Sequence, residues 1–381
     1  MRTCLFIILS VCCAAFSVNG QPLSPAARIS LLTCGAGDEL YASFGHSSVR
    51  VRDTVQQIDL AFNYGTFDFN DPHFYANFVR GKLNYMLHVT KFANFLFAYE
   101  AEQRWVFEQE LNFTPEQRQD VFAFLINNSL PENKYYLYDF LFDNCTTRIR
   151  DLLETACGEQ LALPDKPLAP PPTFRALLHP YLHTAPWSQL GIDILLGSRT
   201  DRPASPREYL FLPDFLSEAV GSAQLNGQPA VAESRYLFRP DGQPPHNAPC
   251  CTPTVLFFAL LVIVGIATLA RLPMKGFDAA WFLLLGLFGL FLLFMWAGTE
   301  HYVTKANFNL LWAFPAHAAV AIALLRKRRP RWVKWYFAVT FPACILLCIF
   351  WTLVPQYLNS SLIFVTLLTG LRAFAELRTK A

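Results

Sequence analysis

Charged residues are scarce in this sequence. Asp, Glu, Lys and Arg together make up 16% of its 381 residues, whereas soluble globular domains average about 25%. The two signs nearly cancel, leaving a formal net charge of +2, and no basic cluster predicts a nucleic-acid surface. With 53% hydrophobic residues, the composition excludes an ordinary soluble protein and indicates a membrane protein with a large soluble part.

Motifs for cofactors and metals are also missing. The sequence contains no phosphate-binding loop and no dinucleotide-binding fingerprint. His179 and His183 are the one loose pair at ligand-like spacing, but Pro180 lies between them and interrupts a regular helical face. We therefore expect neither a metal site nor a cofactor.

The N-terminus has the pattern of a secretory signal peptide. Met1 and Arg2 form a short basic region, and an apolar run extends from Cys4 to Val18. We expect cleavage near Gly20, so that residues 1–20 are the signal peptide and the following part of the chain is exported.

Five cysteines remain outside the signal peptide and the later apolar segments. They are Cys34, Cys145, Cys157, Cys250 and Cys251. Because this number is odd in a compartment that permits disulfides, at least one thiol stays free or pairs between chains. The sequence leaves the pairing of the others open.

The composition changes near residue 253. Residues 21–239 have the Gly, Pro and charge distribution of a globular domain, and the proline-rich residues 240–252 are typical of a linker. Residues 253–376 contain five apolar segments that predict transmembrane helices, and residues 377–381 are left as a cytoplasmic tail. The five segments are Thr254–Ala270, Phe277–Ala297, Leu310–Leu325, Tyr336–Val354 and Leu362–Phe374.

Basic residues between the apolar segments predict the orientation. They cluster between the third and fourth segments, with two more between the first and second. Placing both of these loops in the cytoplasm satisfies the positive-inside rule. The N-terminal domain is then outside the membrane, and the C-terminus is cytoplasmic.

An aromatic run meets a single cysteine at residues 138–151. Apolar residues recur at helical spacing over Ile149–Ala156, and Asn144 is a competent N-cap, which places Cys145 in the first turn of a helix. There the unpaired N–H groups and the positive end of the helix dipole stabilise a thiolate and can bind an oxyanion. A buried, inert cysteine is the alternative interpretation.

A β-hairpin is predicted upstream of this cysteine. One strand contains His46, the turn centres near Thr54 and Val55, and the second strand returns to Asn63. In this register His46 lies opposite Asn63, and Asp59 faces the same side two pairs further along.

A histidine on a strand, a polar partner on the next strand and a cysteine at a helix start are the parts of a cysteine-nucleophile site. The order His46, Asn63, Cys145 is that of the circularly permuted papain-like branch, which includes lecithin:retinol acyltransferase-like proteins. We therefore expect an α+β domain with a permuted papain-like cysteine fold, followed by an all-α transmembrane bundle of about five helices.

The third member of the site is open at this point. Asn63 is favoured by the hairpin register. Tyr64, Asp59 and Asn144 are the other candidates for orienting His46 or for binding an oxyanion.

Several phrases in order resemble the Lnb-type lipoprotein N-acyltransferases. They are Phe44-Gly45-His46-Ser47-Ser48-Val49-Arg50-Val51, Asn63-Tyr64-Gly65-Thr66-Phe67-Asp68-Phe69, Gly81-Lys82-Leu83-Asn84-Tyr85, Asn144-Cys145-Thr146-Thr147-Arg148-Ile149-Arg150-Asp151, Leu196-Gly197-Ser198-Arg199 with Asp201, and Thr299-Glu300-His301 followed by Thr304, Asn307 and Asn309-Leu310-Leu311-Trp312. The resemblance covers nearly the whole mature chain.

The resemblance implies a multi-pass inner-membrane enzyme with its N-terminal domain in the periplasm. Cys145 would take an acyl chain from a phospholipid as a thioester, with His46 as base, and pass it to the N-terminal amine of a diacylated apolipoprotein. His301, Asn307 and Asn309 would face lipid at the membrane surface. The implied partners are thus a phospholipid donor, an apolipoprotein acceptor and the membrane, with no nucleic acid.

Two other functions use the same residues. A membrane-tethered peptidoglycan peptidase or amidase would need the same cysteine and histidine. A non-enzymatic membrane scaffold would instead hold Cys145 in a disulfide with Cys34 or Cys157.

Overall fold

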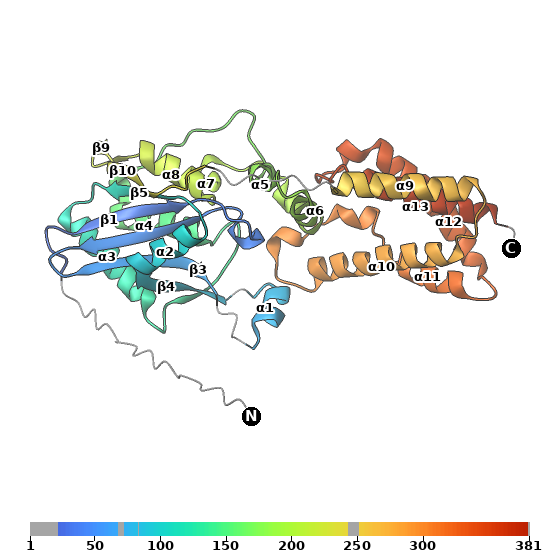
Figure 1. Cartoon of the computed structure of the whole chain (residues 1–381), viewed down its shortest axis with the longest axis horizontal. Helices are drawn as coiled ribbons and strands as arrows, with labels where there is room; N and C mark the ends of the chain where they lie inside the picture. Colours follow the sequence, from blue (N-terminus) through green and yellow to red (C-terminus); the bar gives the residue numbers. More distant parts are fainter. Residues whose placement is uncertain (1–21, 68–71, 83, 243–250, 380–381) are drawn as a thin grey trace, which may run out of the picture.

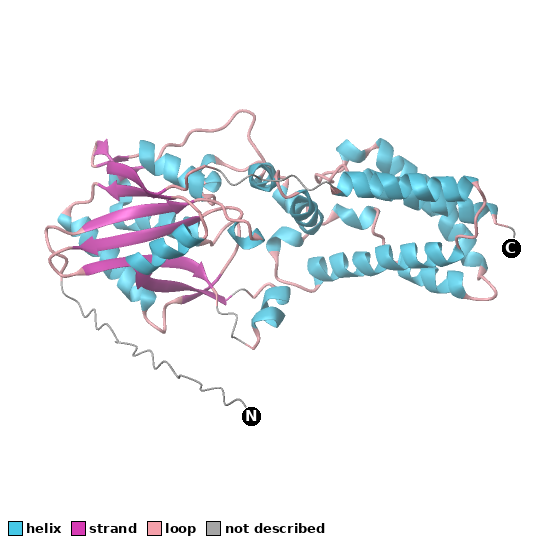
Figure 2. Cartoon of the chain, viewed as in Figure 1, coloured by secondary structure: helices cyan, strands magenta, loops and turns pink. Residues whose placement is uncertain are grey.

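The computed structural model describes residues 22–67, 72–82, 84–242 and 251–379. The chain forms two parts joined end to end, a first part built around a β-sheet and a second part made of helices (Figures 1 and 2). The expected signal peptide, residues 1–20, lies outside the described residues, as does most of the expected linker.

The first part is built on a seven-stranded antiparallel sheet, which makes it an α+β domain, as expected. In spatial order the strands are β10 (Val231–Phe238), β5 (Val106–Leu111), β1 (Arg28–Cys34), β2 (His46–Asp53), β3 (Ile58–Thr66), β4 (Asn84–Lys91) and β6 (Tyr135–Leu137).

Helices cover both faces of this sheet, because alternate side chains of each strand point to opposite sides. On one face, Leu31, Val51 and Phe62 form the main core with α3 (Pro115–Ser129), α4 (Cys145–Cys157) and α8 (Pro213–Ser222). On the other face, Leu32 and Ala61 pack against α2 (Phe92–Ala101).

Shorter elements complete this domain. They are η1 (Leu40–Ala42), α1 (Phe74–Arg80), η2 (Gly158–Gln160), α5 (Phe174–Leu182), α6 (Pro186–Leu195), η3 (Ser198–Thr200), α7 (Pro206–Tyr209), and a small sheet of β7 (Leu161–Ala162), β8 (Gln224–Leu225) and β9 (Gln228–Pro229). In Figure 1, α5 and α6 lie on the side of the domain that faces the helical part.

The predicted β2–β3 hairpin forms, but its register differs from the expected one by two residues. Asp53 pairs with Ile58, so the turn centres between Val55 and Gln56. The Asp53 carboxylate accepts hydrogen bonds from the N–H groups of Val55 and Gln56 at 2.9 and 3.1 Å, and these bonds shape the turn.

This register changes the partner of Asn63. Continued along the strands, it sets Asn63 beside Ser48 rather than beside His46. A shift of two residues leaves the facing of every side chain unchanged, so His46 and Asn63 still lie on the same face of the sheet.

Five α-helices of the second part overlap the five expected apolar segments. They are α9 (Pro253–Leu269), α10 (Lys275–Ala297), α11 (His317–Leu325), α12 (Arg331–Ile349) and α13 (Leu362–Arg378). Within the described residues, α10 and α12 are the two helices that are long and apolar enough to cross a membrane. At 1.5 Å per residue, α9 spans about 25 Å, somewhat less than the hydrocarbon thickness.

The third expected span, Leu310–Leu325, is broken rather than continuous. The chain forms η5 (Phe308–Leu311), then a loop, and then the nine-residue α11. Pro315 lies in this loop, and the loop lies directly against α10, where a Cβ on Gly289 would come within 1.9 Å of the Ala313 carbonyl oxygen. Where the two backbones touch, the chain is a loop and not the regular helix that hydropathy alone predicts.

A buried ion pair joins the helices at the end of the bundle far from the sheet domain. The Arg372 guanidinium on α13 donates to both carboxylate oxygens of Asp278 on α10, at 2.5 and 2.6 Å. It also donates to the Thr268 hydroxyl on α9 at 2.6 Å. Charged residues inside an apolar helix bundle are stable when paired in this way, which accounts for the presence of Asp278 on α10 and Arg372 on α13.

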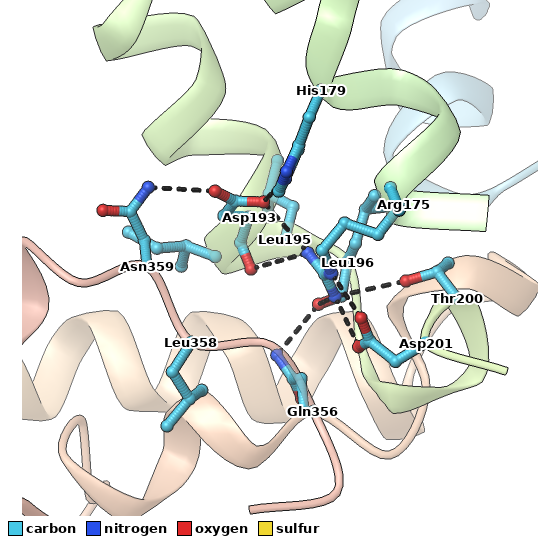
Figure 3. A network of polar contacts seen from close by, with 12 residues as sticks. Arg175, His179, Asp193, Leu195, Leu196, Thr200, Asp201, Gln356, Leu358 and Asn359 are labelled. Carbon is cyan, nitrogen blue, oxygen red and sulfur yellow. Dashed lines mark hydrogen bonds and ion pairs between the residues drawn. The ribbon is translucent and has the colours of Figure 1, made fainter. Parts of the chain in front are cut away.

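The two parts of the chain meet around Arg175 on α5 (Figure 3). Its guanidinium donates to the Asp201 carboxylate at 2.8 and 3.0 Å and lies 3.3 Å from the Asp193 carboxylate. Asp193 is fully buried, and it accepts a hydrogen bond from Asn359 of the second part at 2.9 Å. His179 contacts the same carboxylate at 2.9 Å.

Side chains of the second part also bind the carbonyl groups at the C-terminal end of α6. Gln356 donates to Leu196 at 3.0 Å (Figure 3), and Asn307 donates to Ile194 at 2.7 Å. Asn309 donates to Ile194 at 3.1 Å. A helix end leaves carbonyl groups without intrahelical partners, and these amides supply the missing donors.

Gly197 allows the closest approach between the two parts. Its N–H donates to the Val303 carbonyl at 2.8 Å, and a Cβ at this position would lie 2.0 Å from the Lys305 carbonyl oxygen. Only glycine fits here without moving the backbone of η4 (Tyr302–Thr304) or of the residues that follow it.

We predict that Arg175→Met strongly destabilises the protein. The variant leaves the buried Asp193 carboxylate without its guanidinium partner, and breaking a buried pair in this way costs about 3–5 kcal/mol. The measurement is the midpoint of thermal unfolding of the detergent-purified protein, followed by tryptophan fluorescence.

Arg207→Met is the matched control. Arg207 pairs with Asp151 and Glu154 at the surface, where such pairs contribute about 0–1 kcal/mol. Equal shifts in the unfolding midpoint of the two variants would contradict the proposed importance of the buried network.

Candidate active site

Helix α4 begins at Cys145, which confirms the expected position of this cysteine in a first helical turn. The side-chain oxygen of Asn144 accepts hydrogen bonds from the N–H groups of Thr146 and Thr147, both at 2.9 Å. The Thr147 hydroxyl accepts one from the Asn144 N–H at 2.8 Å. This capping box fixes the direction in which α4 leaves the preceding loop.

The amide group of the same Asn144 side chain is also occupied. It donates to the Phe140 carbonyl at 2.9 Å and to the Phe211 carbonyl at 2.8 Å. Asn144 therefore holds the start of α4, and the structure corrects the expectation that its side chain is available to orient His46 or to bind an oxyanion.

His46 begins β2 and lies within hydrogen-bonding reach of the Cys145 thiol. The sulfur also accepts a hydrogen bond from the Ser47 N–H, and the Thr146 hydroxyl lies 3.6 Å from it. The structure thus brings together the predicted base and the predicted nucleophile, which are separated by 98 residues in sequence.

The surroundings of Cys145 favour its thiolate. Burial raises the pKa of the thiol, but the charge of His46 and hydrogen bonds from His46, Ser47 and Thr146 outweigh burial and lower the pKa from its ordinary value of 9.0 to about 7. Near neutral pH, a substantial share of the Cys145 side chains is therefore in the nucleophilic thiolate form.

The backbone N–H of Cys145 is a candidate oxyanion donor. It is the first N–H of α4, and within the described ranges it donates no hydrogen bond to another part of the chain. An N–H beside a nucleophilic sulfur is suited to the oxyanion that forms when the sulfur attacks a carbonyl carbon.

An open pocket of about 310 Å³ lies beside His46. It is lined by His46, Asn63, Thr66, His88, Thr90, Asn94, Phe95, Ala98 and Tyr99. His46 and Asn63 therefore share one pocket on the α2 side of the sheet, even though they are not cross-strand partners.

Asn63 remains a predicted orienting residue. Its side-chain nitrogen lies 3.4 and 3.5 Å from the carbonyl oxygens of Ala61 and His88, which is long for a hydrogen bond. In the part of the chain that the structure describes, no hydrogen bond joins the side chains of Asn63 and His46.

The structure corrects the two remaining candidates for the third position. Asp59 forms a two-pronged ion pair with Arg50, at 2.7 and 2.8 Å, so its carboxylate is already committed away from His46. Tyr64 points to the face of the sheet opposite Asn63 and is buried in the main core. No hydrogen bond from Tyr64 to Cys145 is present among the residues described.

Three tyrosines that sequence reasoning missed surround the thiol. Tyr99 comes from α2, Tyr136 from β6 and Tyr138 from the loop before α4. Burial is the largest cause that raises the pKa of each hydroxyl, and the nearby Cys145 raises it further. The density of aromatic residues before the cysteine was visible in the sequence, but their convergence on it was not.

Gly65 makes room where Tyr138 and Cys145 converge. It has a φ of 84°, and a Cβ there would lie 3.6 Å from the Tyr138 ring and 3.7 Å from the Cys145 Cβ. A side chain at this position would be strained in the backbone and would enter the site.

Cys34 pairs with His46 across β1 and β2 and is fully buried. Burial raises the pKa of the Cys34 thiol to about 12, so it stays protonated at neutral pH. Cys34, Cys145 and Cys157 are all free thiols in the structure, and the disulfide expected for a scaffold protein is not formed among them.

The three residues expected to face lipid instead hold the two parts together. His301 contacts the Phe78 carbonyl of α1 through Nε2 at 2.8 Å. Asn307 and Asn309 are 1% and 0% exposed, because they bind the end of α6. For Asn307 and Asn309 the expectation of lipid contact is wrong.

Across the described ranges, no three side chains of His, Cys, Asp or Glu gather in a way that could hold a metal ion.

Comparison with known families matches both parts of the chain. Residues 23–179 match the family model of the Lnb N-terminal periplasmic domain, and residues 245–381 match that of the Lnb transmembrane domain. No curated protein and no solved structure matches the chain.

We predict that alkylation of Cys145 by iodoacetamide rises with pH through a midpoint near 7, because the thiolate is the reactive form and the pKa of Cys145 is about 7. In His46→Ala the main influences that lower this pKa are lost, so the midpoint moves up towards the ordinary 9.0 or beyond it. Peptide mass spectrometry over a pH series measures both midpoints.

Cys157 is the internal control in the same experiment. Burial raises the pKa of its thiol to about 11, so it stays unmodified at neutral pH while the protein is folded. An identical midpoint for Cys145 in the wild type and in His46→Ala would show that His46 does not set its reactivity.

Proposed function

The chain belongs to the Lnb family, and on that premise we propose that it is a membrane acyltransferase with Cys145 as its nucleophile. It moves a fatty acyl chain from a phospholipid to the N-terminal amine of diacylated apolipoproteins. The observation that carries the proposal is a thiol with a pKa near 7, placed at a helix start beside a strand histidine. The domain is a permuted papain-like fold in this proposal.

In the first half-reaction the Cys145 thiolate attacks an ester carbonyl carbon of the phospholipid. A carbon–sulfur bond forms, and the oxyanion is held by the N–H of Cys145. The carbon–oxygen bond to glycerol then breaks. His46 gives its proton to the departing oxygen, so that a lysophospholipid leaves and a thioester remains.

In the second half-reaction the neutral amine of the lipoprotein's N-terminal cysteine attacks the thioester carbonyl. A carbon–nitrogen bond forms, the carbon–sulfur bond breaks, and His46 accepts the proton that the amine releases. Cys145 returns as a thiolate. The sum transfers one acyl group from oxygen to nitrogen and needs no other reactant.

The position of the nucleophile near the membrane part supports lipid substrates. Phe142, three residues before Cys145, has its ring 5.5 Å from that of Tyr302 in η4, which belongs to the second part of the chain. The nucleophile thus lies close to the periplasmic loops of the transmembrane domain, where both substrates are anchored by their acyl chains.

All five segments cross the inner membrane in this proposal, the third as η5, its loop and α11 together. The other segments that are short tilt little or thin the bilayer locally. The basic loops and the C-terminus are cytoplasmic. Figure 1 supports this arrangement, because the sheet domain and the C-terminus lie at opposite ends of the molecule.

The alternatives are less well supported. A peptidoglycan peptidase has no need for extensive contacts between its catalytic domain and a helical bundle, such as those of Arg175 and Gln356. A disulfide scaffold requires Cys145 to be oxidised, whereas it is a free thiol in this structure.

We predict that the purified protein in phospholipid nanodiscs adds one acyl chain to a synthetic diacylated lipopeptide and releases an equal amount of lysophospholipid. Cys145→Ala gives neither product, because the thioester cannot form. Intact-mass analysis of the lipopeptide and of the lipid fraction measures both.

Cys157→Ala is the control for the loss of a thiol, since Cys157 is buried in the core away from the site. Transfer by both cysteine variants would rule out Cys145 as the nucleophile. Release of fragments from peptidoglycan by the wild type, with the lipopeptide unchanged, would favour the peptidase instead.

A second prediction concerns the base and its orienting residue. His46→Ala lowers the rate of thioester formation by about 10²–10⁴-fold, the usual contribution of a positioned base. Asn63→Ala lowers it less, because the base remains but its ring is less well held. Single-turnover kinetics over a pH series measures both effects.

Asp59→Asn is the comparison for Asn63→Ala. Asp59 lies on the same strand but binds Arg50, so its amide variant leaves thioester formation within about twofold of the wild type once folded protein is equalised. An effect of Asn63→Ala no larger than that of Asp59→Asn would remove Asn63 from the site.

A further inference from the structure

A continuous series of aromatic rings leads from the surface of the molecule to Cys145. Neighbouring rings in the series have their centroids 4.5–6.0 Å apart, and the last ring touches the position that Gly65 keeps open beside Cys145. We call the series the aromatic track: Phe78, Phe74, Phe67, Tyr85 and Tyr138.

The outer end of the aromatic track lies on α1, which is tied to the transmembrane domain. The Glu300 N–H donates to the Arg80 carbonyl at 2.9 Å, and His301 contacts the Phe78 carbonyl at 2.8 Å. Gly81, the residue after α1, packs directly against the backbone of Glu300 and His301. A Cβ at Gly81 would lie 2.6 Å from the His301 backbone nitrogen. In Figure 1, α1 lies between the sheet and the near end of α10.

Helix α1 is apolar but has no buried residue. Tyr75 is 70% exposed, Phe78 46% and Val79 44%, and the one charged residue of the helix is Arg80 at its C-terminal end. An aromatic helix with a basic residue at its edge, placed beside the end of a membrane-spanning helix, has the composition of a segment at a lipid headgroup surface.

We propose that α1 lies in the outer leaflet of the membrane and that the aromatic track holds the acyl chain of the donor phospholipid while its ester carbonyl reaches Cys145. The inference rests on the proposed acyl transfer and names the route of its first substrate.

The physical reason for such a route is the cost of moving an acyl chain through water. Each CH₂ group that leaves an apolar environment costs about 0.8 kcal/mol, so lifting a whole chain from the leaflet would be prohibitive. Phe78 is exposed and Phe74, Phe67 and Tyr138 are partly buried, so these rings let the chain stay in apolar contact with its end still in the bilayer. The buried Tyr85 connects Phe67 to Tyr138 beneath this surface. After transfer to Cys145, the thioester is held by the same contacts.

The first test compares two acyl donors with Phe78→Ser. With a long-chain phospholipid in mixed micelles, we expect the KM for thioester formation to rise about 10-fold with kcat nearly unchanged, because one apolar contact surface is lost. With a short-chain, water-soluble thioester donor, we expect no change. Phe78→Leu restores an apolar surface and should recover most of the phospholipid KM.

Val55→Ser is the control variant. Val55 is 69% exposed, like Tyr75, but lies in the turn at the opposite end of the β2–β3 hairpin from His46. Its KM for both donors should equal that of the wild type.

The second test detects lipid contact directly. A photoreactive benzoylphenylalanine replaces Tyr75 in one variant and Val55 in another, and each is reconstituted with phospholipid that carries an alkyne at the end of its acyl chain. Illumination should attach lipid at position 75 and not at position 55.

The outcomes separate this inference from the proposed function. If the wild type forms no thioester with phospholipid but does so with the soluble donor, the proposed function fails. Three results overturn the aromatic track but leave the acyltransferase standing, provided that the wild type reacts with phospholipid. Phe78→Ser keeps the wild-type KM for phospholipid, or Phe78→Ser loses activity equally with both donors, or the photoreactive group at position 75 captures no lipid.

Discussion

The arrangement of the site depends on the hydrogen bonds of one buried side chain, Asn144. Its oxygen caps the first N–H groups of α4, and its amide group clamps two separate loops through the carbonyls of Phe140 and Phe211. The helix start is thereby fixed in the domain. The neighbouring Thr146 hydroxyl donates to the Ser47 hydroxyl of β2 at 3.3 Å, and Cys145 lies beside His46. A cap that holds only its own helix contributes about 0.5–2 kcal/mol, but this one also positions the Cys145 thiol.

The junction between the two domains follows the same physical rule at a larger scale. Carbonyl groups at the end of α6 need donors, and Asn307, Asn309 and Gln356 of the transmembrane domain supply them. These are hydrogen bonds to the backbone, so they depend on the position of the chain more than on its side chains. The sheet domain is thereby held at a fixed place beside the adjoining loops of the transmembrane domain.

Local features of the fold were predictable because their causes lie within a few residues. Asn144 caps α4 as predicted, because the N–H groups that it binds belong to Thr146 and Thr147, two and three residues away. The hairpin register was wrong by two residues, because the Asp53 carboxylate builds a wider turn than strand propensity reveals. The prediction that His46 and Asn63 lie on the same face of the sheet still holds, because side chains on a strand return to the same face every two residues.

Features set by contacts between distant segments were not predictable from the sequence. Hydropathy treated residues 310–325 as one helix, although the chain is a loop between Leu311 and His317, where it lies against Gly289 of α10. The expected roles of Asn307 and Asn309 at lipid were wrong for a similar reason, because their partners on α6 are more than 100 residues away. The tyrosines around Cys145 come from three parts of the chain, and only the assembled domain brings them together.

If the chemistry is acyl transfer, the pKa near 7 of Cys145 also bears on which amine can be the acceptor. An α-amine has a pKa of about 7.7–8.0 and is partly neutral under conditions where the thiolate exists, whereas a lysine amine, at about 10.4, stays protonated and cannot attack a thioester. At the near-neutral pH at which the thiolate forms, an N-terminal amine is therefore a better acceptor than a lysine amine.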